Sequence, residues 1–403
     1  MMVRNRRLIQ TICLAVACFL LWPLPFWAGA SKFVIQLSPF VSVCSAIATR
    51  SVGIGLAGGL IVAAIAIFQR RWFCIYACPV GLLLDGLTRV GLKKSRWWSR
   101  CPSLGKYFAI LTMTGSIVGY PLLLWMDPLA IFSNSFAIRI SANFISGALA
   151  LLGLLTLFLL SFISGSVWCA RWCPLGGTLD LLASIRTPLR IGSKTAFKRA
   201  PSAAFAGSPT LEGRRYFIFA AVGLAAGFGA RRLGAARREN APLRPPGAVA
   251  ESTFTGMCLR CGHCVRSCPT KIVHPDVGQA GIAGLMAPVL RFDKSYCRED
   301  CAACTKVCPS GALQPLELAV KNRYIIGEAL MDGSLCVLAL GQRDCDACMR
   351  ACPFQAVQIH WDEEQYVAYP VVDFNKCNGC GACEVACPTA GDKAIRVWKR
   401  TDG

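Results

Sequence analysis

The sequence predicts two parts of different architecture: an α-helical membrane half with four spans and a short fifth, followed by a small cysteine-rich α+β domain. Long apolar stretches fill the first half, and sixteen of the 24 cysteines fall between residues 258 and 387. The charge is also unevenly shared. Residues 1–215 hold 22 Lys and Arg against four acidic residues, whereas residues 250–403 hold 16 basic and 17 acidic residues. The formal net charge of +21 therefore belongs to the membrane half and the linker.

Four apolar stretches are long enough, or nearly so, to cross a bilayer, which takes about 20 residues. They are residues 8–28, 52–68, 108–126 and 144–167. Basic residues gather before the first stretch, between the second and third, and after the fourth, so the positive-inside rule places both ends of this unit in the cytoplasm. The basic residues are then topology anchors. Nucleic-acid binding, the other explanation of a pI near 9.3, is not expected.

The membrane half, residues 1–185, contains an internal repeat. Residues 73–87 align without gaps on residues 168–182, and each copy contains Cys-x-x-x-Cys-Pro. Cysteines at i and i+4 share one helix face, so two such pairs on the cytoplasmic side are able to converge on one metal or cluster. Three interpretations stay open: a fifth cluster, another functional thiol role, or reduced thiols that pack helix ends. The cysteines are Cys74, Cys78, Cys169 and Cys173.

No haem, flavin or nicotinamide cofactor is expected. Gly53 begins a G-x-G-x-x-G pattern, but it lies inside an apolar span with no strand before it, so small-residue helix packing is the better interpretation. The three histidines, His263, His274 and His360, all lie outside the membrane half, which argues against haem bound between helices. The C-x-x-C-H haem-attachment pattern is absent from the sequence.

Residues 186–249 join the two parts. Residues 187–213 are basic and rich in Pro, Ser, Ala and Gly, which predicts a loop. Residues 214–230 open with Arg214 and Arg215 and continue as a short apolar run, a pattern that resembles a twin-arginine export signal. We expect this run to be a fifth span that places the cysteine-rich domain in the periplasm.

The cysteine-rich domain, residues 250–403, contains four quartets that each close on Cys-x-x-x-Cys-Pro. The first and last have the C-x2-C-x2-C-x3-C-P spacing of bacterial 4Fe–4S ferredoxins. Structural zinc sites normally use one or two C-x2-C pairs, and disulfide frameworks show no such repeated triplets. The sequence therefore predicts a polyferredoxin domain with four 4Fe–4S clusters in two ferredoxin-like units. The sixteen ligands are Cys258, Cys261, Cys264, Cys268, Cys297, Cys301, Cys304, Cys308, Cys336, Cys345, Cys348, Cys352, Cys377, Cys380, Cys383 and Cys387.

The pairing of quartets is a separate prediction. The cysteine before the proline usually ligates the neighbouring cluster. Because two regular quartets flank two irregular ones, we expect nested pairing, first with fourth and second with third. Cys387 then completes the first site and Cys268 the fourth. His263, between two ligands of the first quartet, is expected to be a local hydrogen-bonding residue and not a ligand.

The stretch LRPPGAVAESTFTGMCLRCGHCVRSCP (243–269) and the four quartets resemble NapG-type ferredoxin proteins. The membrane half, with its two Cys-x-x-x-Cys-Pro motifs, resembles NapH-type proteins, and the MauM/MauN and NosG/NosH types are similar. The whole chain thus resembles a natural NapH–NapG fusion. One departure is that residues 186–213 lack the cytoplasmic ferredoxin segment that usually follows the fourth span of NapH-like proteins.

The resemblance implies a bacterial inner-membrane protein that takes electrons from membrane quinol and delivers them to a periplasmic reductase, of the nitrate- or nitrous-oxide-reductase type, or to an intermediate carrier. Quinol oxidation requires a proton acceptor, for which Asp127 is the candidate; its alternative is a helix-end residue before Pro128. A rival function is a membrane ferredoxin-type maturation or assembly factor for a partner oxidoreductase. Sixteen clustered ligands exceed what a thiol chaperone needs, which favours electron transfer.

Overall fold

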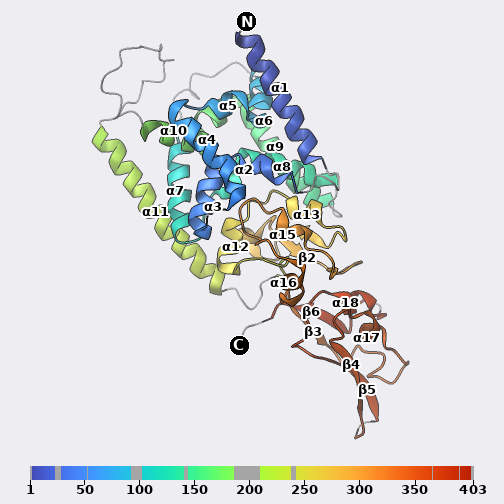
Figure 1. The fold of residues 1–403 in the computed structure, drawn as a ribbon. Helices are drawn as coiled ribbons and strands as arrows, with labels where there is room; N and C mark the ends of the chain where they lie inside the picture. Colours follow the sequence, from blue (N-terminus) through green and yellow to red (C-terminus); the bar gives the residue numbers. More distant parts are fainter. Residues whose placement is uncertain are drawn as a thin grey trace.

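The computed structural model describes residues 2–22, 29–51, 53–91, 102–139, 144–185, 209–236, 242–364, 366–389 and 391–400. A helical half is followed by a cysteine-rich domain that extends away from it in two successive units (Figure 1). The helices of the first half are α1 (Met2–Leu21), α2 (Lys32–Gln36), α3 (Pro39–Thr49), α4 (Ala57–Phe68), α5 (Trp72–Tyr76), α6 (Pro79–Val90), α7 (Gly105–Ile117), α8 (Pro128–Ser135), α9 (Phe144–Ser164), α10 (Pro174–Ile185) and α11 (Pro209–Ala236), with short turns η2 (Ile54–Leu56), η4 (Leu124–Met126), η5 (Phe136–Arg139) and η6 (Trp168–Trp172).

The helices differ in length from the predicted spans. Within the described ranges, α9 over Gly147–Ser164 and α11 over Glu212–Gly234 are long and apolar enough to cross a membrane. Helix α7 has only 13 residues, because Gly119 adopts a left-handed backbone (φ 82°) and Pro121 follows it. Helix α4 has 12 residues and is preceded by a 3₁₀ turn in a glycine-rich stretch. Four spans therefore stay a prediction.

The predicted linker is partly helical. Helix α11 begins at Pro209, so the last residues of the expected loop 187–213 are helical, and the rest of that loop lies outside the described residues. The helix extends to Ala236 and is thus longer than the predicted run 214–230.

Small residues set the closest helix contacts. A Cβ atom added to Gly59 would clash with the hydroxyl of Ser42, so α4 touches α3 only because glycine is there. Of the neighbouring G-x-G-x-x-G pattern, Gly55 lies against the side chain of Gln36 and Gly58 against that of Leu37, whereas Gly53 has open space beside it. Helix α11 packs along α7 in the same way, with Gly223 against Leu111 and Gly227 against Gly115. The N-terminal end of α11 lies near α10 and its other end meets α12 (Glu251–Met257) of the cysteine-rich domain (Figure 1).

The cysteine-rich domain consists of short elements around the cysteine loops. Its three two-stranded antiparallel sheets pair β1 with β2, β3 with β6 and β4 with β5, with Val273 opposite Leu290, Glu328 opposite Trp398 and Val357 opposite Val372. The remaining elements are α13 (His263–Ser267), β1 (Val273–Pro275), α14 (Gly281–Gly284), β2 (Pro288–Leu290), α15 (Ala303–Lys306), α16 (Leu318–Arg323), β3 (Glu328–Met331), α17 (Ala347–Ala351), β4 (Val357–Asp362), β5 (Val367–Val372), α18 (Ala382–Ala386) and β6 (Ile395–Trp398).

The core of the helical half extends into the cysteine-rich domain. Leu259 and Cys261, of the first cysteine loop, belong to the same buried cluster as Phe40 and Leu129 of the helices. A second buried cluster lies entirely within the cysteine-rich domain and includes cysteines of all four quartets. The first loop is therefore built into the helical half, whereas the last loops lie far from it (Figure 1).

Candidate functional site

The first cysteine site lies where α12, α13 and α15 meet. Cys258 follows α12, Cys264 lies in α13, and Cys308 closely follows α15. With Cys261 these residues line one small cavity. The amide of Leu313 donates to Cys308 Sγ over 3.4 Å, so a main-chain N–H faces a sulfur atom. Three thiols from one loop and a fourth from the next quartet fit a 4Fe–4S cluster.

The second site uses the remaining cysteine of the first quartet. Its cavity is lined by Cys268, Cys297, Cys301 and Cys304. Burial raises the pKa of the Cys297 thiol, and the ammonium group of Lys321 counteracts that rise. Lys321 is fully buried and donates to the carbonyl of Arg298, which fixes this positive charge beside the site. A fixed cation favours thiolates and a negatively charged cluster.

The third and fourth sites are neighbours. The third cavity is lined by Cys336, Cys345, Cys348 and Cys387. Burial raises the pKa of the Cys383 thiol, and like charge on nearby thiols raises it further. The thiols that act on Cys383 in this way are Cys380, Cys377 and Cys352, and then Cys348 of the third site. The fourth site therefore combines Cys352 with the first three cysteines of the last quartet.

The nested pairing is therefore wrong. Quartets that follow each other in sequence exchange their last cysteines, first with second and third with fourth. Cys268 completes the second site, not the fourth, and Cys387 completes the third site, not the first. The physical reason is local: a pair of consecutive quartets closes short loops, which costs little chain entropy, and each pair folds as one unit. Mirror symmetry of spacing carries no information about partners.

The donor set fits four cubanes better than single metal ions. Among the described residues, no three His, Cys, Asp or Glu side chains converge closely enough to hold one metal ion. A 4Fe–4S cluster places iron and sulfide between its thiolates and so spreads them more widely than the ligands of one ion. All cysteines that the structure describes are free of disulfide bonds. Four thiols around each site, with peptide N–H groups near sulfur, match iron–sulfur ligation.

The sites form a row whose order differs from that of the sequence. The amide of Cys297 in the second site donates to the carbonyl oxygen of Cys380 in the fourth over 2.9 Å. The first and second sites share one unit, and the third and fourth share the other. The spatial order is therefore first, second, fourth, third, with the first site at the helical half.

His263 docks the first site on the helices. Ser133 of α8 donates to the carbonyl of Cys261 (3.3 Å), so its oxygen accepts from His263 Nε2 (2.8 Å). His263 Nδ1 then accepts from the hydroxyl of Ser31 over 2.7 Å. Burial, and after it the charge of Arg266, lower the pKa of His263 well below its usual range, so the ring is neutral. Both ring nitrogens are engaged, which confirms that His263 is not a ligand.

Asp127 has a structural position. It is fully buried and forms the N-cap of α8, accepting hydrogen bonds from the amides of Leu129 (2.9 Å) and Ala130 (3.2 Å). Its other oxygen accepts from the hydroxyl of Ser38 over 2.6 Å. This geometry gives Asp127 the helix-end role that the sequence offered as the alternative, and proton acceptance from quinol stays a prediction.

The two Cys-x-x-x-Cys-Pro motifs converge. The four cysteines Cys74, Cys78, Cys169 and Cys173 line one cavity of about 200 Å³. Cys78 caps α6, and the amide of Gly176 in the first turn of α10 faces Cys173 Sγ at 3.5 Å. Two helix N-termini thus lie beside the cavity, and their amides counteract the burial that raises the pKa of the Cys78 and Cys173 thiols. This site lies at the end of the helical half away from the cysteine-rich domain (Figure 1).

An ion pair holds the two motifs together. Asp180 of α10 accepts from Arg70 (2.8 Å) and Arg71 (2.7 Å), and Arg71 also donates to the carbonyl of Cys169 over 3.2 Å. These two arginines precede the first motif, whereas Asp180 and Cys169 belong to the second. The motif aspartates differ in role, because Asp85 pairs with Arg89 of its own helix α6 and not, among the described residues, with the other motif.

The sequence did not reveal a third element, a large cavity next to the first site. It has a volume of about 900 Å³ and is lined by α7, α9 and the first cysteine loop, including Arg260. A signal for Arg260 was present in the quartets. The last quartet has Gly379 at the equivalent position, with a left-handed backbone (φ 74°), and Arg260 adopts the same conformation (φ 55°) without being glycine.

Comparison with known proteins gives two family-model matches. The model described as a 4Fe-4S dicluster domain matches residues 257–312 and 343–390. The first match contains all eight cysteines of the first two quartets, and the second contains those of the last two except Cys336. The model described as a 4Fe-4S binding domain matches residues 52–97 and 146–192, which contain the two Cys-x-x-x-Cys-Pro motifs.

Individual relatives align with about two fifths of the chain. Methylamine utilization ferredoxin-type protein MauM of Methylobacillus flagellatus is 36% identical over 166 residues, which are 40% of this chain and 70% of the relative. Ferredoxin-type protein NapG of Escherichia coli is 34% identical over 191 residues, 43% of this chain and 81% of the relative. Ferredoxin-type protein NapF of Escherichia coli is 29% identical over 156 residues, which are 38% of this chain and 85% of the relative. No solved structure matches the chain.

Proposed function

The chain belongs to the family of NapG- and MauM-type ferredoxin proteins, and on that premise we propose that it oxidises membrane quinol and passes the electrons outward through four 4Fe–4S clusters. The family and the 4Fe–4S domains make it a ferredoxin-type electron carrier. The acceptor we propose is a periplasmic reductase, of the nitrate- or nitrous-oxide-reductase type, or an intermediate carrier. The proposed location is the bacterial inner membrane, with the cysteine-rich domain in the periplasm.

One observation carries the proposal: the four sites form a row that begins inside the helical half. Cys261 of the first site is packed in the core of the helices, and His263 bonds to serines of two helical segments. The third site, at the other end, lies in the unit furthest from the helices (Figure 1). When bound, the clusters supply one-electron steps. The protein orients them and sets their potentials through peptide N–H groups, burial and the charge of Lys321.

Exposed apolar faces support the membrane location. Helix α9 leaves Leu152, Leu155 and Leu159 between 53 and 60% exposed, and α11 leaves Phe217 75% exposed. Helix α1 likewise exposes Leu8, at 61%. Apolar side chains exposed along three helices are unfavourable in water and match lipid.

We propose a fifth iron–sulfur centre at the Cys-x-x-x-Cys-Pro motifs. Its support is the convergence of four thiols on one cavity, the two helix N-termini beside them, and the match of both motifs to a 4Fe-4S binding domain. The ion pair of Arg71 and Asp180 fixes the two motifs relative to each other. This centre lies away from the outward row and is therefore proposed for the cytoplasmic side.

Anaerobic purification tests the proposal. We expect iron and sulfide in equal amounts, and reduction of the clusters by quinol followed by EPR. Iron without any quinol-driven reduction would remove the quinol step and favour the maturation factor. Stoichiometric zinc with little iron would contradict the iron–sulfur assignment itself.

A further inference from the structure

The cavity of about 900 Å³ lies between the two kinds of metal centre. At one end its wall contains Leu259 and Arg260 of the first cysteine loop. At the other end it contains Trp168 and Trp172, which flank Cys169 of the second Cys-x-x-x-Cys-Pro motif in sequence. Helix α9 contributes six lining residues, and η4, α8 and Phe108 of α7 contribute further, mostly apolar, side chains. The size is that of a site for a cofactor-sized, largely apolar ligand.

Polar groups in this wall point to a ligand with carbonyl oxygens. In the part of the chain that the structure describes, Arg260 Nη1, Trp168 Nε1 and Trp172 Nε1 are buried donors with no hydrogen-bond partner. A buried donor left unpaired costs about 1–3 kcal/mol. A lipid acyl chain would leave all three unpaired, whereas a ligand with an oxygen at its polar end can accept from them.

Arg260 is fixed in place and leaves one nitrogen free. Its Nε donates to the carbonyl of Leu285 (2.7 Å) and its Nη2 to the carbonyl of Ala283 (2.8 Å). The guanidinium lies 5.8 Å from the ring centre of Trp125, which also lines the cavity. With two nitrogens committed to main-chain carbonyls, the third is oriented before any ligand arrives.

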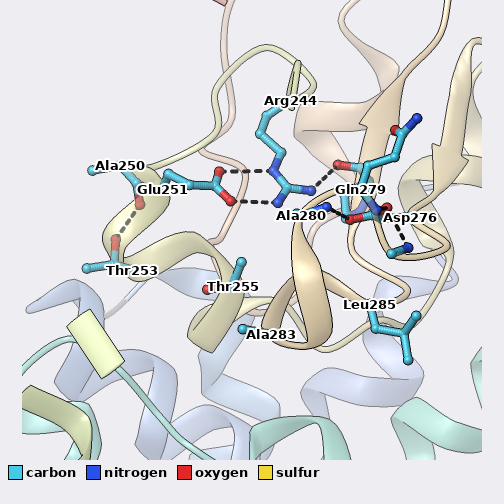
Figure 2. Close-up of polar contacts among 12 residues, drawn as sticks. Arg244, Ala250, Glu251, Thr253, Thr255, Asp276, Gln279, Ala280, Ala283 and Leu285 are labelled. Carbon is cyan, nitrogen blue, oxygen red and sulfur yellow. Dashed lines mark hydrogen bonds and ion pairs between the residues drawn. The ribbon is translucent and has the colours of Figure 1, made fainter. Parts of the chain in front are cut away.

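The carbonyls that hold Arg260 belong to a rigid segment. Asp276 accepts hydrogen bonds from the amides of Gln279 (2.7 Å) and Ala280 (2.8 Å), which closes the loop that leads into α14. Beside it, Arg244 forms a buried two-pronged pair with Glu251 and donates to the carbonyl of Pro288. Figure 2 shows this support around Ala283 and Leu285.

The backbone conformation of Arg260 indicates that its side chain has a functional role beyond packing. A left-handed conformation is costly for a residue with a Cβ, and the equivalent Gly379 shows that the cysteine loop itself is satisfied by glycine. The cost of this backbone conformation at Arg260 is therefore offset by what the arginine side chain does. That side chain projects from between two ligands of the first site, Cys258 and Cys261.

We infer that this cavity binds quinone and quinol, with an oxygen of the ring accepting from Arg260 Nη1 and the isoprenoid tail lying along α8 and α9. This inference rests on the proposed function and gives it a location. Oxidation of one quinol releases two electrons and two protons. With a cluster held by Cys258, Cys261, Cys264 and Cys308, the electrons would pass to it one at a time. The protons go to water, beginning at the hydroxyl pair of Tyr120 and Thr255, which are 3.1 Å apart in the wall.

The test compares Arg260→Gly with Arg298→Gly in the full chain with its clusters. Glycine removes the donor at 260 and relieves the backbone, so the first cluster should persist. Arg298→Gly makes the same change beside the second site, on an exposed side chain away from the cavity. The probes are a short-chain benzoquinone and a short-chain naphthoquinone, titrated by quenching of tryptophan fluorescence, and their quinols as reductants.

We expect Arg260→Gly to weaken binding about 10- to 100-fold, the value of one charge-assisted hydrogen bond. Iron content and the EPR spectrum after dithionite reduction should not change, and Arg298→Gly should bind as the wild type does. Equal binding by the wild type and Arg260→Gly, or no binding of either probe by the wild type, would overturn the inference. So would a Trp172→Phe variant that loses more affinity than Arg260→Gly, because the ring oxygen would then accept from Trp172 and not from Arg260. Binding to the wild type without reduction of clusters by quinol would leave the site in place and refute the proposed function.

Discussion

The amide of Cys297 donates a 2.9 Å hydrogen bond to the carbonyl oxygen of Cys380, and this contact joins the second cysteine site to the fourth. Electrons that enter at the first site must therefore pass through the second and fourth sites before they reach the third. The quartet that is third in sequence lies at the exit because the last two quartets exchange ligands with each other. The row thus has two different ends, the first site at the helical half and the third site away from it.

Two matched substitutions test this order. Cys308→Ser should remove the cluster of the first site and stop quinol-driven reduction of all the others, because the entrance is lost. Cys387→Ser should remove only the cluster of the third site and leave quinol-driven reduction of the rest intact. EPR after reduction by quinol and by dithionite distinguishes the two. A Cys387→Ser variant that blocks the entrance would restore the nested pairing.

The sequence predicted ligands better than it predicted their partners. Cys258 to Cys387 were identified as four quartets because thiols at fixed short spacings can be recognised locally. Exchange of Cys268 and Cys308 between neighbours is a contact in space, which spacing does not encode. The early end of α7 could have been predicted from Gly119 and Pro121, because a glycine and a proline end a helix even inside an apolar stretch. Arg260 was missed because its importance appears only when the backbone of the first and last quartets is compared.

The fifth centre makes a prediction about iron content. With five 4Fe–4S clusters the protein should contain about twenty iron atoms. Cys173→Ser should lower this by about four and leave the EPR signals of the other clusters unchanged, because its cavity is separate from theirs. Cys44→Ser is the matched control, since Cys44 is a buried cysteine of α3 outside the motifs. Sixteen irons in both the wild type and Cys173→Ser would show that the motif thiols hold no cluster.

Removing one partner of the buried pair of Arg244 and Glu251 should lower the stability of the protein. Arg244 also lies 4.8 Å from the ring centre of Phe254, and the side chains of Arg244 and Glu251 are less than a tenth exposed. Figure 2 shows the two hydrogen bonds between them. Arg244→Met leaves the Glu251 carboxylate buried and unpaired, which costs about 3–5 kcal/mol. We expect cluster absorbance to be lost at lower denaturant concentration than in the wild type. Arg89→Met, which breaks the exposed pair with Asp85, should leave that midpoint unchanged.

Helix α11 decides which compartment receives the electrons. Arg214 and Arg215 lie near its start, and its far end meets α12. Between these ends it packs along α7, so it connects opposite ends of the helical half (Figure 1). In the proposed topology, the positive-inside rule puts its start in the cytoplasm. Alkaline phosphatase fused after Ala250 should therefore be active, and the same enzyme fused after Arg190 inactive. The opposite pattern would place the row of clusters in the cytoplasm, and electrons could then not be delivered to a periplasmic acceptor.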